Sequence, residues 1–296
     1  MIGSFFALLT AIFFSFNGIF IRRAVLKVSD ASLGILITTP MAVPFLFLIL
    51  AFTGQMRTIL NFSWQSYVWL LLVGIVHFVV GRSLYYKCAQ LVGTNIASIL
   101  SRVSILISVV IGISLLDEPL SWQLGIGVLF IIGGITLGGL SPRTFQKVSG
   151  QILKIPTKAY VFGFGNGVAW GLSPIFVKLG LKGSGSPIAG ALISFLAATA
   201  VLSISLMNRS RRTSTAHIPG NAAGLFFIGG LFSCTANITR FLALSLAPAS
   251  VVVPLISIQP IFLLVLSFLF NRKLEVFSMP VIIGAVMVVI GGILII

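Results

Sequence analysis

Acidic residues are scarce in this chain. Its 296 residues include 19 Lys and Arg but only four acids, Asp30, Asp117, Glu118 and Glu275, and the formal net charge is +15. Metal-dependent transferases need clustered acids, and hydrolases need a nucleophile beside a base with an orienting partner. The one adjacent acidic pair and two histidines far apart in sequence do not meet either need. We therefore expect no enzymatic activity, no metal and no cofactor.

Cysteines and charged residues are also few. Cys88 and Cys234 both lie in apolar runs, where a small buried side chain is the ordinary role and a disulfide is not expected. Charged residues make up 8% of the chain and hydrophobic residues 58%, with a mean hydropathy of +1.16. Soluble proteins have about 25% charged residues. The composition therefore predicts an integral, multi-pass membrane protein, and we expect it in the cell (inner) membrane.

Basic residues are spread over short segments between the apolar runs. No hydrophilic domain gathers them, so nucleic acid is not an expected partner. Anionic lipid headgroups are the expected general partner. The N-terminal segment is apolar from Met1 and is followed by Arg22 and Arg23, so it is predicted to be a retained first span.

Ten apolar stretches are long enough to cross a hydrocarbon core of about 30 Å. None shows the short alternating pattern of a barrel strand, so we predict an all-α integral membrane fold with ten transmembrane helices. The approximate limits are 2 to 21, 33 to 53, 67 to 89, 93 to 115, 121 to 140, 159 to 179, 187 to 207, 222 to 245, 248 to 270 and 276 to 296.

A basic linker at 141–158 separates a first half, 1–140, from a second half, 159–296, with five predicted spans in each. An odd number of spans per half requires the second half to enter the membrane in the opposite sense. The halves also show weak similarity: Phe14–Arg22 matches Trp170–Lys178 in its aromatic and small residues, and both halves end in Gly-Gly-Ile. These observations predict two inverted five-helix repeats, a common construction of transporters.

The chain resembles the ten-span, EamA-like branch of the drug/metabolite transporter superfamily. The resemblance rests on the duplicated layout, the aromatic-Gly/Ser segments of spans one and six, the Leu-Leu-Asp-Glu-Pro-Leu-Ser turn at 115–121 and the glycine pairs of spans five and ten. It covers nearly the whole chain and implies a membrane transporter. The second half departs from the pattern where Asn271–Leu274 replaces the acidic turn.

The run from Gly93 to Pro119 carries Arg102 near its middle, with no acid nearby to neutralise it. A charge at bilayer depth costs about 2.5–3.5 kcal/mol on insertion scales, so such residues face a protein interior or a wet cavity. Asn95 and Ser101 lie on the same broad helical face. The second-half counterpart, Pro248–Leu274, has no arginine within the membrane. We therefore expect the positive charge of the cavity to be distributed unequally between the two halves.

Two further spans contain a buried arginine. Span eight carries Ser233, Asn237 and Arg240 on one stripe, and span three carries Arg82 and Tyr86 one turn apart. The structural alternatives are helix–helix hydrogen bonding for Ser233, and an Arg82 that extends to the interface. His77 is predicted to be a hydrogen-bonded core residue. Gly163, Gly167 and Gly171 and the glycine pairs are expected to allow close helix packing.

No acid lies in the middle of any span, which disfavours lipophilic cations as substrates and favours a carboxylate or phosphate. We predict a secondary transporter, permease or exporter, that moves a small anionic or zwitterionic metabolite by alternating access, such as an amino-acid-like compound or an organic acid. The alternative is a flippase for a lipid-linked or phosphorylated substrate. We expect a monomer, and a homodimer stays open. The predicted substrate-binding residues are Arg82, Arg102, Arg240, Asn17, Asn95, Ser101, Asn237, Gln259, Ser173, Tyr86 and Trp170.

The basic residues also predict an orientation. Thirteen follow the odd-numbered spans and three lie in the other loops. The positive-inside rule places both termini outside, whereas the family resemblance implies cytoplasmic termini. We adopt the orientation that the charge distribution predicts, with both termini outside.

Overall fold

The computed structural model describes residues 2–116, 122–140, 156–183 and 186–294, and its regular structure in these residues is entirely helical. Six helical segments of this part are long and apolar enough to cross a membrane. Three shorter apolar helices accompany them, at Thr94–Ser108, Gly125–Gly138 and Met279–Leu294. The all-helical, multi-pass class is therefore confirmed. The predicted turn at Asp117–Leu120 and the linker at 141–155 lie outside the described residues.

Several predicted spans of the first half are composites of shorter helices. The π-helix η3 continues α4 into α5 without a break, so Trp64 to Val92 forms one helical segment. The elements are α1 (Ile2–Val25), η1 (Ala31–Gly34), α2 (Ile35–Thr38), α3 (Ala42–Phe52), η2 (Met56–Asn61), α4 (Trp64–Leu72), η3 (Val73–Gly81), α5 (Arg82–Val92), α6 (Thr94–Leu100), α7 (Val103–Leu116), α8 (Trp122–Ile135) and η4 (Thr136–Leu140).

The second half has longer uninterrupted helices and one short polar helix. That short helix, α11, is fully outside the apolar packing, since none of its residues is buried. The elements are α9 (Thr157–Leu181), α10 (Pro187–Ser205), α11 (Arg209–Ala216), α12 (Gly220–Leu246), α13 (Ala249–Ile256), α14 (Gln259–Phe270) and α15 (Met279–Leu294).

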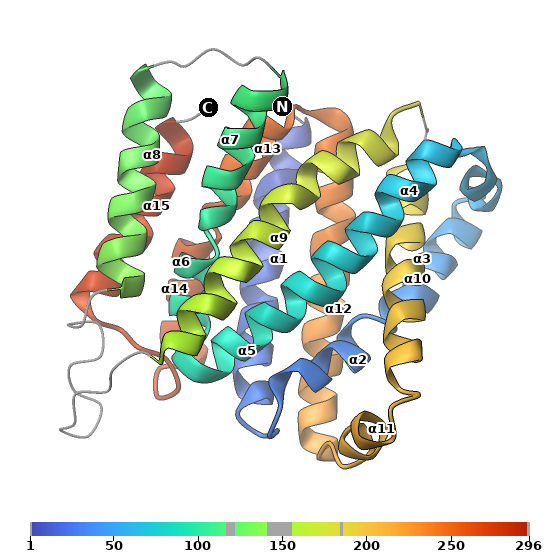
Figure 1. Ribbon diagram of the computed structural model, residues 1–296, viewed down its shortest axis with the longest axis horizontal. Coiled ribbons are helices and arrows are strands. Elements are labelled where there is room, and N and C mark those ends of the chain that lie inside the picture. The colour runs from blue at the N-terminus through green and yellow to red at the C-terminus, as the bar shows by residue number, and fades with distance from the viewer. Residues whose placement is uncertain (1, 117–121, 141–155, 184–185, 295–296) are drawn as a thin grey trace.

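Helices from the two halves interleave. α1 packs against α12, α8 against α15, and α7 against α9. In Figure 1 the α8–α15 pair lies at one edge of the bundle and α3 and α10 lie at the other, with α1 and α12 between them. α1 begins and α15 ends at the same end of the bundle, whereas α11 lies at the opposite end (Figure 1).

Glycines bring two of these helix pairs into close contact. A Cβ atom at Gly171 of α9 would lie 2.7 Å from the Cβ of Ile107 in α7, and one at Gly284 of α15 would lie 2.6 Å from the Cα of Gly138. Gly163 is equally close to Leu100 of α6, at 2.7 Å. The close helix packing expected at Gly163, Gly171 and the glycine pairs is confirmed, since a Cβ atom at Gly134 would lie 2.6 Å from Gly284 O and one at Gly291 would lie 2.5 Å from Gly127 O.

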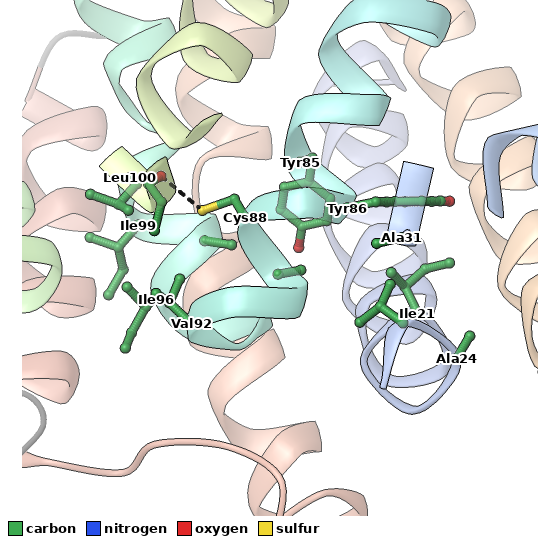
Figure 2. Packing of buried hydrophobic residues seen from close by; sticks show 14 of the residues in the cluster. Ile21, Ala24, Ala31, Tyr85, Tyr86, Cys88, Val92, Ile96, Ile99 and Leu100 are labelled. Carbon is green, nitrogen blue, oxygen red and sulfur yellow. Dashed lines mark hydrogen bonds between the residues drawn. The ribbon is translucent and has the colours of Figure 1, made fainter. Parts of the chain in front are cut away.

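Apolar side chains fill the junction of α1, α5 and α6. Figure 2 shows Ile21 of α1 near Tyr86, and Cys88 and Val92 beside Ile96 of α6. The Cys88 thiol donates to the carbonyl of Ala159 at 3.4 Å. Both cysteines are free and buried, as expected for small core side chains. This packing holds α5 and the start of α6 against α1.

Two of the predicted spans, one from each half, are interrupted near their middle at corresponding positions. Ser101 and Arg102 separate α6 from α7, and Ser257 and Ile258 separate α13 from α14. The hydroxyl of Ser257 donates to Val253 O at 2.7 Å, and the Ser101 Oγ lies 2.7 Å from Ala97 O. Such bonds to the preceding turn compete with the helix ladder. The spans predicted at 93–115 and 248–270 thus each contain two shorter helices, and the second still includes one segment, Val251–Phe270, that is long and apolar enough to cross a membrane.

Candidate functional site

Two adjoining cavities lie where the interrupted helices meet α1, η3, α9 and α12. The larger, of about 60 Å³, is lined by Phe14, His77, Arg102, Ser104, Trp170, Pro174, Arg240, Val253, Ile256, Ser257 and Gln259. The smaller, of about 10 Å³, is lined by Phe14, Asn17, His77, Arg82, Tyr85, Tyr86, Trp170, Ser233 and Gln259. We call the two together the arginine cavity. Since one water needs about 10–15 Å³ by this measure, the larger part has room for a few water-sized groups.

Arg102 lies at the interruption between α6 and α7 and is 5% exposed. Its Nε donates to Ser98 O at 3.1 Å, and its Nη2 donates to the side-chain oxygen of Gln259 at 2.7 Å. Gln259 is the first residue of α14. This hydrogen bond thus links the interruption between α6 and α7 to the start of α14 in the other half.

Arg240 enters the same cavity from α12 and is 4% exposed. Its Nη2 donates to the hydroxyl of Ser173 at 2.8 Å. Its Nη1 is buried and has no hydrogen-bond partner among the described residues. A buried donor without an acceptor costs about 1–3 kcal/mol, and more when charged, so this nitrogen is a candidate contact for an anion.

Arg82, which lines the smaller part, is held by neutral groups. Its Nη2 donates to Ser233 Oγ at 2.9 Å, its Nη1 to Thr39 Oγ1 at 3.3 Å, and its guanidinium carbon lies 5.0 Å from the centre of the Phe78 ring. The side chain is 4% exposed, so it does not extend to the interface. These contacts fix the charge at the wall of the cavity without neutralising it.

His77 lies in the π-helix η3 and lines both parts of the cavity. Its ring stacks on Trp170, with ring centres 5.4 Å apart and planes 23° apart. Its Nδ1 is buried without a hydrogen-bond partner among the residues that the structure places. The expected hydrogen bonding is therefore missing at this nitrogen. The π-helical turn that contains His77 is not visible in the sequence.

The other predicted site residues fall into two groups, those that line the arginine cavity and those that do not. Asn17 and Tyr86 line the smaller part, although Asn17 Nδ2 also donates to Gly229 O at 2.7 Å and the Tyr86 hydroxyl to Thr38 Oγ1 at 3.2 Å. Gln259 and Trp170 line both parts. Four predicted residues are not in either lining: Asn95, Ser101, Ser173 and Asn237.

Contacts between helices account for two of these four residues, Ser101 and Ser173. Ser101 donates to Asn166 Oδ1 of α9, and Ser173 accepts from Arg240. Asn237 Nδ2 donates to Ser233 O at 2.8 Å. The side-chain amide of Asn95 has no partner among the described residues. Ser173 and Ser101 thus act one step away from the cavity, by holding an arginine or a neighbouring helix.

No acid of the described residues reaches the three arginines. Asp30 accepts from Ser32 in the turn before η1, at 2.9 Å from the backbone nitrogen. Glu275 accepts from the backbone nitrogens of Thr94 and Asn95 at 2.7 and 3.1 Å, and Arg22 Nε lies 3.5 Å from it. The positive charge of the cavity is therefore uncompensated within the part of the chain described here.

The role of Glu275 was not predicted from the sequence. Its carboxylate, from the segment before α15, caps the first turn of α6, which begins after Gly93 with a φ of 84°. Burial raises the pKa of Glu275, and Arg22 and the hydrogen bonds from Thr94 and Asn95 lower it in part. The capping residue lies about 180 positions away in sequence from the helix it caps, so a local capping pattern could not reveal it.

The residues described contain no group of three His, Cys, Asp or Glu side chains that could hold a metal ion. The site is instead a cationic, partly aromatic cavity between two halves of a helical membrane protein. The model of the EamA-like transporter family matches residues 1–139 and 157–296.

The chain belongs to the EamA-like transporter family. The predicted resemblance to drug/metabolite transporters is therefore confirmed. The family identifies this EamA-like protein as a membrane transporter of small molecules.

One solved structure, described only as the crystal structure of a protein, is similar over almost the whole molecule. Its TM-score is 0.69 at 14% sequence identity, and the match covers 99% of this chain and 96% of the other. At this identity the likeness concerns the fold alone. Comparison with curated proteins gives no significant match.

Proposed function

We propose that this EamA-like protein is a secondary transporter for a small organic anion or zwitterion, such as an organic acid or an amino-acid-like compound. One observation carries the proposal: Arg102 and Arg240 enter one cavity, and no acid of the described residues accompanies them. A guanidinium group binds a carboxylate or phosphate through two parallel hydrogen bonds. The free Nη1 of Arg240 supplies one such donor.

The chemistry of the lining favours a compact substrate with an apolar part. Phe14 and the His77–Trp170 stack form one side of the larger space, and Val253 and Ile256 contribute further apolar surface. The anionic group would lie against Arg102 and Arg240, with Gln259 as a neutral hydrogen-bonding partner. A zwitterion would place its ammonium group near hydroxyl or carbonyl oxygens of the cavity lining instead of near the arginines.

The mechanism we propose is alternating access between two inverted repeats of five membrane spans each. Paired interruptions at Ser101–Arg102 and Ser257–Ile258 support the repeat, because broken helices at corresponding positions are typical of transporter binding sites. Pro174 and Pro254 lie inside α9 and α13, where each removes a backbone donor and permits bending. Movement of one half against the other would expose the cavity to each side in turn.

The uneven distribution of basic residues among the loops leads us to propose an orientation in the cell (inner) membrane. α11, with Arg209, Arg211 and Arg212, lies at the end of the bundle opposite to the start of α1. By the positive-inside rule this end faces the cytoplasm and the termini face outside. A Ser214→Cys variant tests it, because labelling by a membrane-impermeant thiol reagent in intact cells would place α11 outside.

The substrate class can be tested with purified protein. A thermal-shift screen against organic acids, amino acids, phosphorylated metabolites and cationic compounds should find its strongest stabilisers among the anions or zwitterions. The Arg240→Ala variant should lose that stabilisation, whereas Arg57→Ala, the same change at an exposed position, should keep it. Equal stabilisation of Arg240→Ala and wild type, or hits only among cations, would contradict the proposal. Nothing in the described residues favours the flippase alternative.

A further inference from the structure

A second concave surface lies far from the arginine cavity, at the end of the bundle where α1 ends and α12 begins (Figure 1). It is an open groove of about 620 Å³, lined by Arg23, Leu26, Lys27, Asn221, Leu225 and Leu274, and we call it the basic groove. A neighbouring depression of about 340 Å³ shares Lys27 with it and reaches Thr213 and His217 beside α11. The two spaces therefore meet at the Lys27 side chain.

The lining of the basic groove divides into a polar and an apolar part. Arg23, Lys27 and Asn221 supply hydrogen-bond donors, whereas Leu26, Leu225 and Leu274 supply hydrocarbon surface. Leu26 is 47% and Leu274 36% exposed, although both adjoin charged side chains. A ligand that satisfies both parts must be amphipathic, with an anionic head and an apolar tail.

Arg23 and Lys27 each have a hydrogen-bond donor without an acceptor in the described part of the chain. Arg23 is held in place because its Nε donates to Asn271 Oδ1 at 2.7 Å and its Nη2 to Phe270 O. In the part of the chain that the structure describes, its Nη1 has no acceptor, and the Lys27 ammonium group forms neither a hydrogen bond nor an ion pair. The groove thus presents a guanidinium edge held by two hydrogen bonds and an unpaired ammonium group to whatever occupies it.

The surroundings add to the positive potential. Basic residues cluster at this end of the molecule, in α11 and in the segment after α14: Arg209, Arg211, Arg212, Arg272 and Lys273. Asp30 and Glu275, the acids described in the structure, are already engaged with Ser32 and with Thr94 and Arg22. Asn221 is the second residue of α12, so the partial positive charge of that helix end points to the same place.

We propose that the basic groove binds an anionic membrane phospholipid. Lys27, Arg23 and Asn221 hold the phosphate, and an acyl chain lies along Leu26, Leu225 and Leu274. A lipid fits better than a soluble anion because the apolar part of the groove continues onto the ends of membrane-spanning helices, where acyl chains are the solvent. Basic pockets between helix ends on the cytoplasmic side are suited to anionic headgroups, and the orientation proposed above places this groove on that side. This site is separate from the arginine cavity, and its existence does not depend on the transported substrate.

Native mass spectrometry of the detergent-solubilised full chain tests this inference. Dioleoyl phosphatidylglycerol should bind at least about fivefold more tightly than dioleoyl phosphatidylcholine, because one interfacial basic residue contributes a factor of about five. Lys27→Gln should lower phosphatidylglycerol affinity about fivefold. Lys182→Gln, the same loss of charge after α9 at the other end of the bundle, should leave the affinity unchanged.

Two further arms separate a lipid from a free phosphate. Leu26→Asn should weaken phosphatidylglycerol binding, since it removes part of the surface for the acyl chain, and glycerol phosphate without chains should not compete with the lipid. Full competition by glycerol phosphate would show a soluble-anion site instead of a lipid site. Unchanged lipid affinity in Lys27→Gln, or an equal loss in Lys182→Gln, would overturn the assignment of the groove. Transport activity is not needed for any of these measurements.

Discussion

Arg102 Nη2 donates a 2.7 Å hydrogen bond to the side-chain oxygen of Gln259, and the two residues lie at the interruptions of helices from opposite halves of the chain. The bond joins α6–α7 to α14 across the arginine cavity. An amide is a neutral acceptor, so it orients the guanidinium group without cancelling its charge. That distinction leads to the first prediction.

Replacing Gln259 by Glu should convert this neutral contact into an ion pair. The new carboxylate would neutralise Arg102 and compete with the substrate, so we expect affinity for the anionic ligand to fall at least tenfold, about 1.4 kcal/mol. Melting temperature should not fall, because the pair satisfies a buried charge. Gln123→Glu, at an exposed position of α8, is the control and should leave ligand affinity unchanged. Undiminished binding in Gln259→Glu would show that Arg102 does not contact the anion.

Substitutions of His77 test whether the His77–Trp170 stack contacts the substrate. His77→Phe keeps an aromatic ring that can stack on Trp170 but removes the unpartnered Nδ1. If that nitrogen bonds the substrate, KM should rise about two- to tenfold, the value of one hydrogen bond, with little change in melting temperature. His77→Ala should also lower the melting temperature, since it removes the stacked ring. Transport by His77→Phe with an unchanged KM would assign His77 to packing alone.

Glu275 predicts a dependence of stability on pH. Because burial raises its pKa above the ordinary 4.5, and Arg22 offsets this only in part, the folded state binds the proton more tightly than the unfolded state. The free energy of unfolding should therefore fall as pH rises from 4.5 through the folded-state pKa, and stay constant above it. Glu275→Gln cannot titrate and should show a flatter profile of melting temperature against pH. Identical profiles for the two proteins would exclude Glu275 as the group responsible.

Glycine contacts between α8 and α15 predict a contrast between two substitutions. Gly284→Ala would bring a methyl group within 2.6 Å of the Gly138 Cα, and overpacking of this kind costs about 1–3 kcal/mol. Gly125→Ala, in α8, meets no atom within 4 Å and should be neutral or slightly stabilising. Thermal unfolding in detergent would measure both. A Gly284→Ala variant as stable as the Gly125→Ala variant would show that the two helices can move apart at little cost.

Hydropathy and charge in the sequence were sufficient to predict the class of this protein and to select the arginines that are candidates for its site. Apolar runs of bilayer length, with almost no acids, are compatible only with a multi-pass membrane fold, and the same scarcity makes each arginine within a run conspicuous. Arg82, Arg102 and Arg240 could be selected because a charge in such a run is costly unless it faces protein or water. The glycine stripe at Gly163, Gly167 and Gly171 was recognisable from spacing alone for a similar reason, since small residues one turn apart permit close contact.

Only the tertiary structure could decide which of the polar residues meet. Arg102 and Gln259 are 157 positions apart, and nothing local in either segment encodes their contact. Asn95 and Ser101 share a broad helical face with Arg102 in the sequence, yet neither lines the cavity, and Ser101 instead bonds Asn166 of α9, 65 positions away. The Glu275 cap on α6 likewise depends on a distant segment, and the π-helix around His77 has no recognisable pattern in the sequence. Composition and periodicity thus determined the environment and its unpaired charges by themselves, whereas the site was decided by packing between the halves, because only packing brings remote segments within hydrogen-bonding distance.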